Sequence, residues 1–215
     1  IQPLLVLISE SLQVLPDPTN KDMEKWCHPE IQESIDSLVR YLSVLQVIVR
    51  FCDAPHLPSL AEWAVQLLSP CLKVVQERTV STPSYAIVFP KLAGTHQQIL
   101  RSAAPQEETA LTIFSNTVPL VVQALEQTRS AATFKYVSAA VEIFGSKSVE
   151  VDGSFQDLLS HMTSVVTRLV NPAEMTGLLQ AYFECLHRYT LYCPRALCYN
   201  PQFTTDRKSV VWERV

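Results

Sequence analysis

The sequence predicts an all-α fold made of antiparallel helical hairpins. Only four of the 215 residues are glycine, whereas glycine makes up about 7% of an average protein. Tight β-turns and phosphate-binding loops depend on glycine because they need positive φ angles. Fourteen prolines punctuate long segments in which apolar residues recur every three or four positions, and proline is well tolerated at the first position of a helix. These observations favour helices joined by glycine-poor connectors.

The clearest helix is expected over residues 29–51. Its apolar residues recur at alternating steps of four and three, which places them along one stripe of a helix. They are Ile31, Ile35, Leu38, Leu42, Leu45 and Val49. A second group widens the stripe, so we expect a helix buried on more than one side; its members are Val39, Tyr41, Val44 and Ile48. Pro29 suits the first position, where no intrahelical N–H bond is needed.

The next two segments each carry an internal proline. Residues 58–78 are expected to form a helix kinked at Pro70, because proline removes a hydrogen-bond donor and clashes with the preceding turn. The expected buried face of that helix consists of Leu60, Trp63, Leu67, Cys71 and Val74. A helix over residues 83–102 is expected to be bent or split by Pro90 and Gly94.

Two more regular helices follow. Over residues 105–127, Glu107 and Glu108 suit the positive end of the helix dipole. The apolar stripe of this helix comprises Leu111, Phe114, Val118, Val121 and Leu125, with Pro119 inside it. Over residues 131–144 the stripe comprises Phe134, Val137, Val141 and Phe144. Gly145 is expected to end that helix in a left-handed cap.

The last helices are expected over residues 154–170 and 172–193, with Asn171 and Pro172 between them. Ser154 and Asp157 resemble a capping box at the start of the first. Its stripe comprises Phe155, Leu158, Met162, Val165 and Leu169. The stripe of the second comprises Met175, Leu178, Tyr182, Cys185, Tyr189 and Tyr192, before Pro194. Residues 1–15 are interpreted as the end of an earlier hairpin.

Pairing consecutive helices gives hairpins that begin near residues 29, 83, 131 and 172. Of the intervals of 54, 48 and 41 residues, the shortest matches the repeat of about 40–47 residues found in HEAT and armadillo arrays, and the two longer ones imply extended connectors. Since every helix has an apolar stripe but no central core can be assigned, we expect an α-solenoid of antiparallel HEAT or armadillo-type hairpins over residues 1–205. A compact helical bundle is the alternative.

The start of the chain suggests a fragment of a longer protein. The chain begins at Ile1 inside an apolar run, with neither a methionine nor a signal peptide. Residues 206–215 do not continue the helical pattern and resemble a translated sequencing adapter, so we expect an artefactual tail. The alternative is a natural loop followed by a short strand.

Composition argues against several classes of protein. The net charge of −4 disfavours a nucleic-acid binder, which needs a basic face. The apolar runs are too short or too interrupted for a membrane span. The six cysteines form no spaced framework, which favours a reducing compartment.

No residue set matches a catalytic or metal-binding motif. Cys185, His187, Cys193 and Cys198 look superficially like a zinc set, but residues 185 and 187 point to opposite sides of one helix and no C-x-x-C pair occurs. His161 has no nucleophile motif that it could serve. We therefore expect neither an enzyme nor a cofactor or metal site.

The polar faces of alternate helices are the candidate partner-binding surface. In a solenoid, one helix of each hairpin lines a continuous concave surface that binds extended partners. The candidates are Glu62, Gln66 and Lys73 in one helix and Gln156, Ser160 and Thr163 in another. The alternative is that these side chains are simply solvated.

The segment Phe134–Gly145, with the sequence FKYVSAAVEIFG, resembles a helix of the importin-β superfamily, the karyopherins, in its transportin-SR and importin-thirteen branch. Residues 178–194 resemble the next helix of those receptors, and the similarity extends over about residues 20–200. Receptors for Ser/Arg-rich factors carry several arginines in that helix. Here Arg188 matches, while Glu184 and Tyr192 stand where arginine is expected, and phosphoserine recognition needs clustered guanidinium groups. That cargo specificity is therefore not expected, and Arg188 is kept as a partner-binding candidate.

The resemblance implies a monomeric nuclear transport receptor that shuttles between cytoplasm and nucleus. Such a receptor binds protein cargo, contacts nuclear pore proteins and is regulated by the GTPase Ran in its GTP form. Ran would bind an N-terminal region that is missing from this chain. Neither nucleic acid nor a membrane is expected as a partner. The alternatives are a HEAT-repeat scaffold or adaptor unrelated to transport, and an enzyme whose catalytic domain lies elsewhere in a longer chain.

Overall fold

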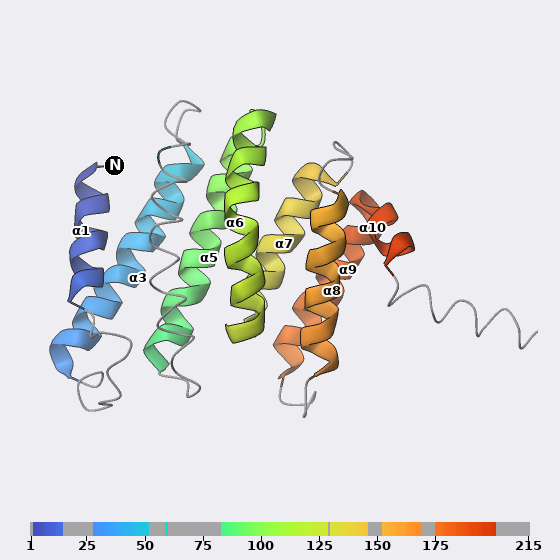
Figure 1. The fold of residues 1–215 in the computed structure, drawn as a ribbon. Helices are drawn as coiled ribbons and strands as arrows, with labels where there is room; N and C mark the ends of the chain where they lie inside the picture. Colours follow the sequence, from blue (N-terminus) through green and yellow to red (C-terminus); the bar gives the residue numbers. More distant parts are fainter. Residues whose placement is uncertain are drawn as a thin grey trace, which may run out of the picture. The chain divides into compact units, whose positions relative to one another are not determined.

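The computed structural model describes residues 2–14, 28–51, 59, 83–128, 130–145, 152–168 and 175–200. Within these ranges the chain forms eight α-helices and no strand (Figure 1), which confirms the all-α prediction for them. The helices are α1 (Gln2–Gln13), α3 (Pro29–Arg50), α5 (Pro83–Ala103), α6 (Glu107–Thr128), α7 (Ala131–Phe144), α8 (Asp152–Thr167), α9 (Thr176–Tyr192) and α10 (Pro194–Tyr199). They fall into two compact units, Ile1–Thr128 and Arg129–Val215.

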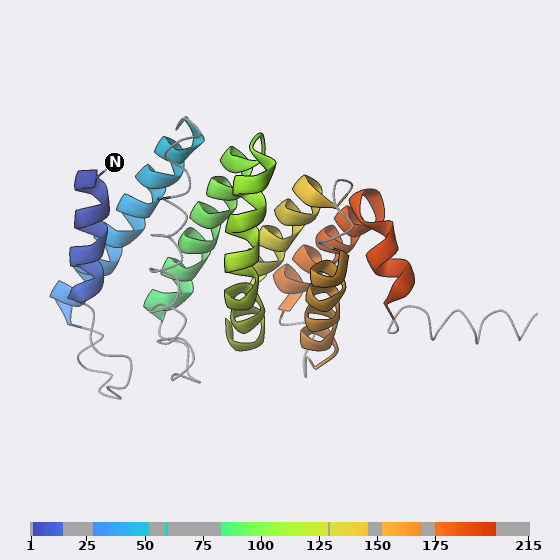
Figure 2. The same ribbon diagram turned by 45° about the horizontal axis from the view of Figure 1, so that its top comes forward.

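In the first unit, α3 packs along α5, α1 packs against α3, and α6 packs against α5 (Figure 2). The contact between α3 and α5 includes a hydrogen bond of 3.0 Å from the Ser102 hydroxyl to the carbonyl of Val49. Val49 lies in the last turn of α3, and its carbonyl also accepts a backbone N–H at the cap of that helix. The Ser102 hydroxyl therefore adds a second hydrogen bond to this carbonyl and links α5 to the end of α3.

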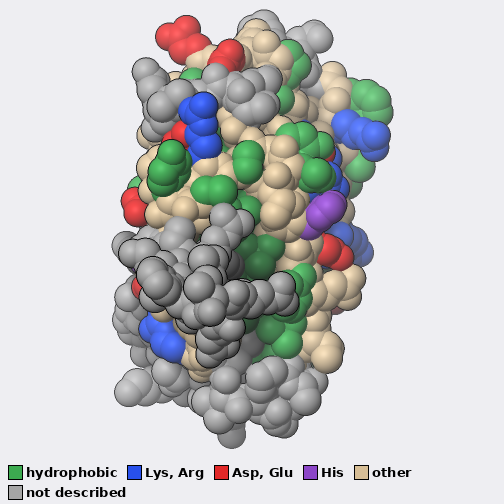
Figure 3. Space-filling view, turned by 90° about the vertical axis from the view of Figure 1, so that its right-hand side faces the viewer, with side chains coloured by type: hydrophobic (Ala, Val, Ile, Leu, Met, Phe, Trp, Pro, Cys, Tyr) green, Lys and Arg blue, Asp and Glu red, His purple; other side chains and the backbone are tan. Residues whose placement is uncertain are grey.

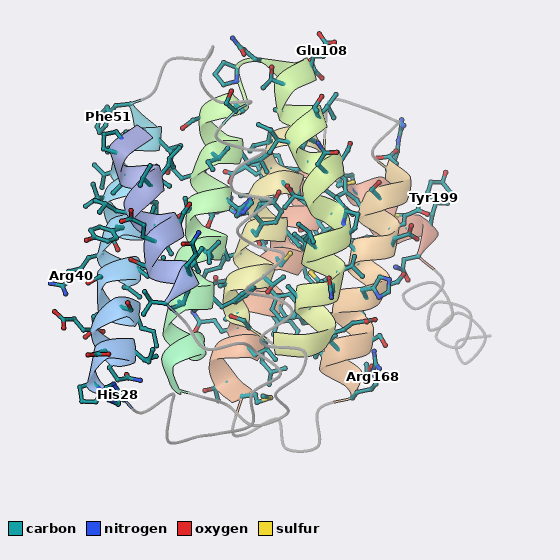
Figure 4. All side chains as sticks on the ribbon, turned by 60° about the vertical axis from the view of Figure 1, so that its left-hand side comes forward. His28, Arg40, Phe51, Glu108, Arg168 and Tyr199 are labelled. Carbon is teal, nitrogen blue, oxygen red and sulfur yellow. The ribbon has the colours of Figure 1, made fainter. Side chains whose placement is uncertain are left out.

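The stripe predicted on α3 is confirmed at five positions. Its buried residues are Ile35, Leu38, Leu42, Leu45 and Val49, while Ile31 is half-buried. The prediction that α3 is buried on more than one side is wrong at Val44, which is 50% exposed. Val47 and Phe51 lie on the same outer side and are 60% and 78% exposed, and Phe51 projects from the end of α3 (Figure 4). The neighbours α1 and α5 contact the opposite side of the helix, and this explains the difference.

The helix α5 is not split at Pro90 or Gly94, contrary to one of the expected outcomes. Pro90 is exposed. At Gly94 an added Cβ would lie 2.7 Å from the side-chain amide nitrogen of Gln46 on α3. The glycine therefore leaves space that the flexible end of the Gln46 side chain occupies. In α6, Glu107 and Glu108 lie in the first turn as predicted, and Pro119 is accommodated inside the helix.

In the second unit, α7 and α9 run side by side, α8 contacts both, and α10 packs against α8 and α9 (Figures 1 and 2). The predicted stripe of α7 is buried throughout. The predicted stripe of α9 is buried from Leu178 to Tyr189, while Met175 and Tyr192 are half-buried. Ser130 caps α7 by accepting a hydrogen bond of 3.3 Å from the backbone N–H of Ala132.

Gly145 does not form the expected left-handed cap. Its φ and ψ angles are −58° and −24°, in the right-handed helical region that any residue adopts. The glycine is needed for a close approach instead, because an added Cβ would lie 2.6 Å from the backbone oxygen of Tyr192. The end of α7 therefore meets the end of α9 backbone to backbone.

Two further boundaries differ from the sequence prediction. The helix α8 begins at Asp152, so Ser154 lies inside the first turn and is not the N-cap of a capping box. The chain also continues as a short helix, α10, beyond residue 193, with Pro194 at its first position. Pro194 was expected only to end the preceding helix. It also begins the next one, because proline disrupts helix interiors but fits the first position of a helix.

Candidate partner-binding surface

The polar face predicted on α8 is partly used to hold the second unit together. The Ser160 hydroxyl donates to the carbonyl of Gln156 at 2.9 Å and accepts a hydrogen bond of 2.9 Å from the side-chain amide of Asn200. Asn200 lies at the end of α10 and is 1% exposed. Since a buried amide without a partner would cost free energy, Ser160 stabilises the attachment of α10 to α8.

Thr163 has a similar role toward α9. Its hydroxyl donates to the carbonyl of Leu159 at 2.8 Å and lies 3.0 Å from the hydroxyl of Tyr182. Either hydroxyl can be the donor in the second bond. Burial raises the pKa of Tyr182, so its hydroxyl keeps its proton near neutral pH. The ring of Tyr182 also meets the ring of Phe134 on α7 edge to face, with 6.0 Å between centroids.

The outward side of α8 is polar and weakly charged. Asp157, Thr167 and Arg168 are exposed there, and Gln156 is half-buried. Arg168, at the C-terminal end of the helix (Figure 4), donates to the carbonyl and hydroxyl of Ser164 at 3.0 and 2.9 Å. This side of the helix offers hydrogen-bonding groups and one exposed charge of each sign, and the positions of Thr167 and Arg168 are held by bonds to Ser164.

Arg188 belongs to an ion pair between α9 and α7. Its Nη1 lies 3.8 Å from Oε1 of Glu142, and the two side chains are 42% and 35% exposed. An ion pair this exposed contributes about 0–1 kcal/mol to stability. The structure thus places Arg188 beside a carboxylate of its own chain.

The other predicted contact residues, Glu62, Gln66 and Lys73, lie outside the described residues, as does Trp63 of the buried face predicted for residues 58–78. The structure brings Gln156, Ser160 and Thr163 together on α8 and places Arg188 on the neighbouring α9. The role of these residues in partner binding stays a prediction.

In the second unit, Cys185 and Cys193 are buried as neutral thiols and Cys198 is exposed. Burial raises the pKa of Cys185 to about 12, and its thiol donates to the sulfur of Met162 at 3.7 Å. Burial also raises the pKa of Cys193, whose thiol donates to Oδ1 of Asp152 at 3.7 Å. Cys198 and His187 are exposed. In the part of the chain that the structure describes, no three potential ligands come close enough to hold a metal ion.

Two features of this surface were not predicted from the sequence. Asn200 was not singled out, although an asparagine directly before a proline often marks the end of an element. The exposed apolar side chains Phe183, Leu191 and Tyr199 were also missed. On the side seen in Figure 3, apolar side chains are interspersed with acidic, basic and histidine side chains, and no single charge dominates it.

None of the helices in the described ranges has the length and apolar character needed to cross a bilayer. Comparisons with protein-family models, with curated proteins and with solved structures found no match for this chain.

Proposed function

We propose that this chain is part of a HEAT-type α-solenoid in a nuclear transport receptor and that the outward side of α8 contributes to its cargo-binding surface. The observation that carries the proposal is the packing of α7 along α9 in the second unit, two helices that α8 separates in the sequence. Stacked hairpins bring such alternate helices together. In the first unit α3 lies along α5, the next helix in the described part of the chain.

The position of α8 supports the same arrangement. In the second unit α8 contacts both α7 and α9 without separating them, as the second helix of a hairpin does. Its inner side is apolar, with Phe155, Leu158 and Met162 buried, and its outer side is polar. An array of such helices presents a continuous polar surface to an extended partner.

Hydrogen bonds inside the second unit would fix that surface before a partner arrives. Ser160 and Thr163 join α8 to α10 and α9, so the backbone of α8 is held in place while Gln156 and Asp157 remain accessible. Binding to a surface that is already ordered loses less conformational entropy. We expect Gln156 and Asp157 to contact cargo and Ser160 and Thr163 to position them.

The assignment to transport rests on the resemblance of Phe134–Gly145 to the importin-β superfamily. This segment comprises most of α7 and the glycine that follows it. A regulated carrier needs different affinities for cargo in two states, because Ran-GTP shifts binding only by that difference. A superhelix can supply the difference, since small rotations between neighbouring repeats add up to a change of curvature.

The solenoid is tested by small-angle X-ray scattering of this chain. A compact domain of 215 residues should have a radius of gyration of about 17 Å, whereas stacked hairpins should give a clearly larger value and an asymmetric distance distribution. Deleting residues 206–215 controls for the contribution of the tail. A symmetric distribution near about 17 Å would favour a compact bundle.

Transport is tested on the complete protein that contains this chain. Cargo affinity should change at least about tenfold with excess Ran-GTP, which corresponds to about 1.4 kcal/mol of coupling. Equal affinities with and without Ran-GTP, for nuclear and cytoplasmic cargo candidates, would favour a static scaffold.

The binding surface is tested separately with matched variants. Gln156→Ala and Asp157→Ala should each weaken cargo binding about two- to tenfold, as expected for the loss of one hydrogen bond. Gln180→Ala is the control, because Gln180 is an exposed glutamine on α9 that bonds to Glu184 of the same helix at 2.8 Å. Equal effects of all three variants would argue against a surface on α8.

A further inference from the structure

We draw no further inference here: the strongest candidate, the pair of exposed apolar side chains Phe183 and Leu191 on the outer side of α9, has nothing in the structure that shows what covers it.

Discussion

The hydroxyl of Tyr189 on α9 donates a hydrogen bond of 3.0 Å to the backbone carbonyl of Phe155 on α8, and their rings meet edge to face with 6.0 Å between centroids. Both side chains are fully buried. Burial raises the pKa of Tyr189 well above its ordinary value, so the hydroxyl remains a donor at neutral pH. One side chain therefore supplies both a polar and an aromatic contact between the two helices.

Replacing Tyr189 by phenylalanine separates these contributions. Tyr189→Phe keeps the ring contact and removes the donor, so the free energy of unfolding should fall by about 0.5–1.5 kcal/mol. Urea titration measures the loss. Tyr199→Phe, at an exposed site on α10, should change stability by less than about 0.5 kcal/mol. Equal losses in the two variants would contradict the interhelical role of the Tyr189 hydroxyl.

The close approach of Gly145 to Tyr192 predicts opposite effects for two glycine substitutions. Gly145→Ala should destabilise the chain by about 1–3 kcal/mol, because the new methyl group would overlap the backbone oxygen of Tyr192. Gly153→Ala should stabilise it by about 0.5–1 kcal/mol, since Gly153 lies in the first turn of α8 with nothing within 4 Å of the added Cβ. Thermal unfolding of both variants gives the sign directly. A neutral Gly145→Ala variant would show that the ends of α7 and α9 separate easily.

Leu38 tests the core between α3 and its neighbours in the first unit. It is completely buried, so Leu38→Ala should cost about 2–5 kcal/mol through lost contacts and a residual cavity. Val47→Ala is the control on the same helix, because Val47 is exposed; its effect should stay within about 0.5 kcal/mol. The midpoints of urea unfolding distinguish the two. If Val47→Ala cost as much as Leu38→Ala, the assignment of the two sides of α3 would be reversed.

The buried thiol of Cys185 predicts a loss of stability at alkaline pH. Burial raises its pKa from 9.0 to about 12, so between these values the folded chain holds a proton that the unfolded chain has lost. This thiol should therefore leave stability unchanged below pH 9 and lower it as the pH rises toward 12, by up to about 1.4 kcal/mol per pH unit.

The test compares Cys185→Ala with the unmodified chain. For each, the free energy of unfolding is measured as a function of pH, and the slopes are compared. The variant should start from a lower stability, because it leaves a small cavity, but should lose less as the pH rises. Cys198→Ala, which removes an exposed thiol, should keep the slope of the unmodified chain. A Cys185→Ala slope identical to that of the unmodified chain would refute the contribution of this thiol.

Helix positions were predictable from the sequence because the spacing of apolar residues is a local property. The five buried positions of α3 and the bounds of α7 follow from it directly. Spacing does not say which side of a helix a neighbour will cover, so Val44 was assigned to the core although it is exposed. In the sequence, an exposed valine at this spacing looks the same as a buried one.

The roles of individual side chains could not be predicted, because they depend on contacts between residues that are far apart in the sequence. The sequence predicts that Gly145 lies at a helix end. The reason that a glycine is needed there is the backbone of Tyr192, which leaves no space for a Cβ. Ser160 and Thr163 were predicted to face a partner, and their hydroxyls bond to Asn200 and Tyr182. Such pairings arise only when helices pack, and a single sequence carries no local signal for them.

The burial of α7 has a consequence for hydrogen exchange. Of its fourteen residues only Lys135 is exposed, so no turn of this helix can open without breaking contacts on several sides. Its amides should exchange with deuterium through concerted opening of the second unit. The six-residue α10 has several exposed side chains and holds to α8 through the amide of Asn200, so its amides should exchange through a local opening and on a much shorter timescale. A gradient of amide lifetimes should therefore run through the second unit from α7 to α10.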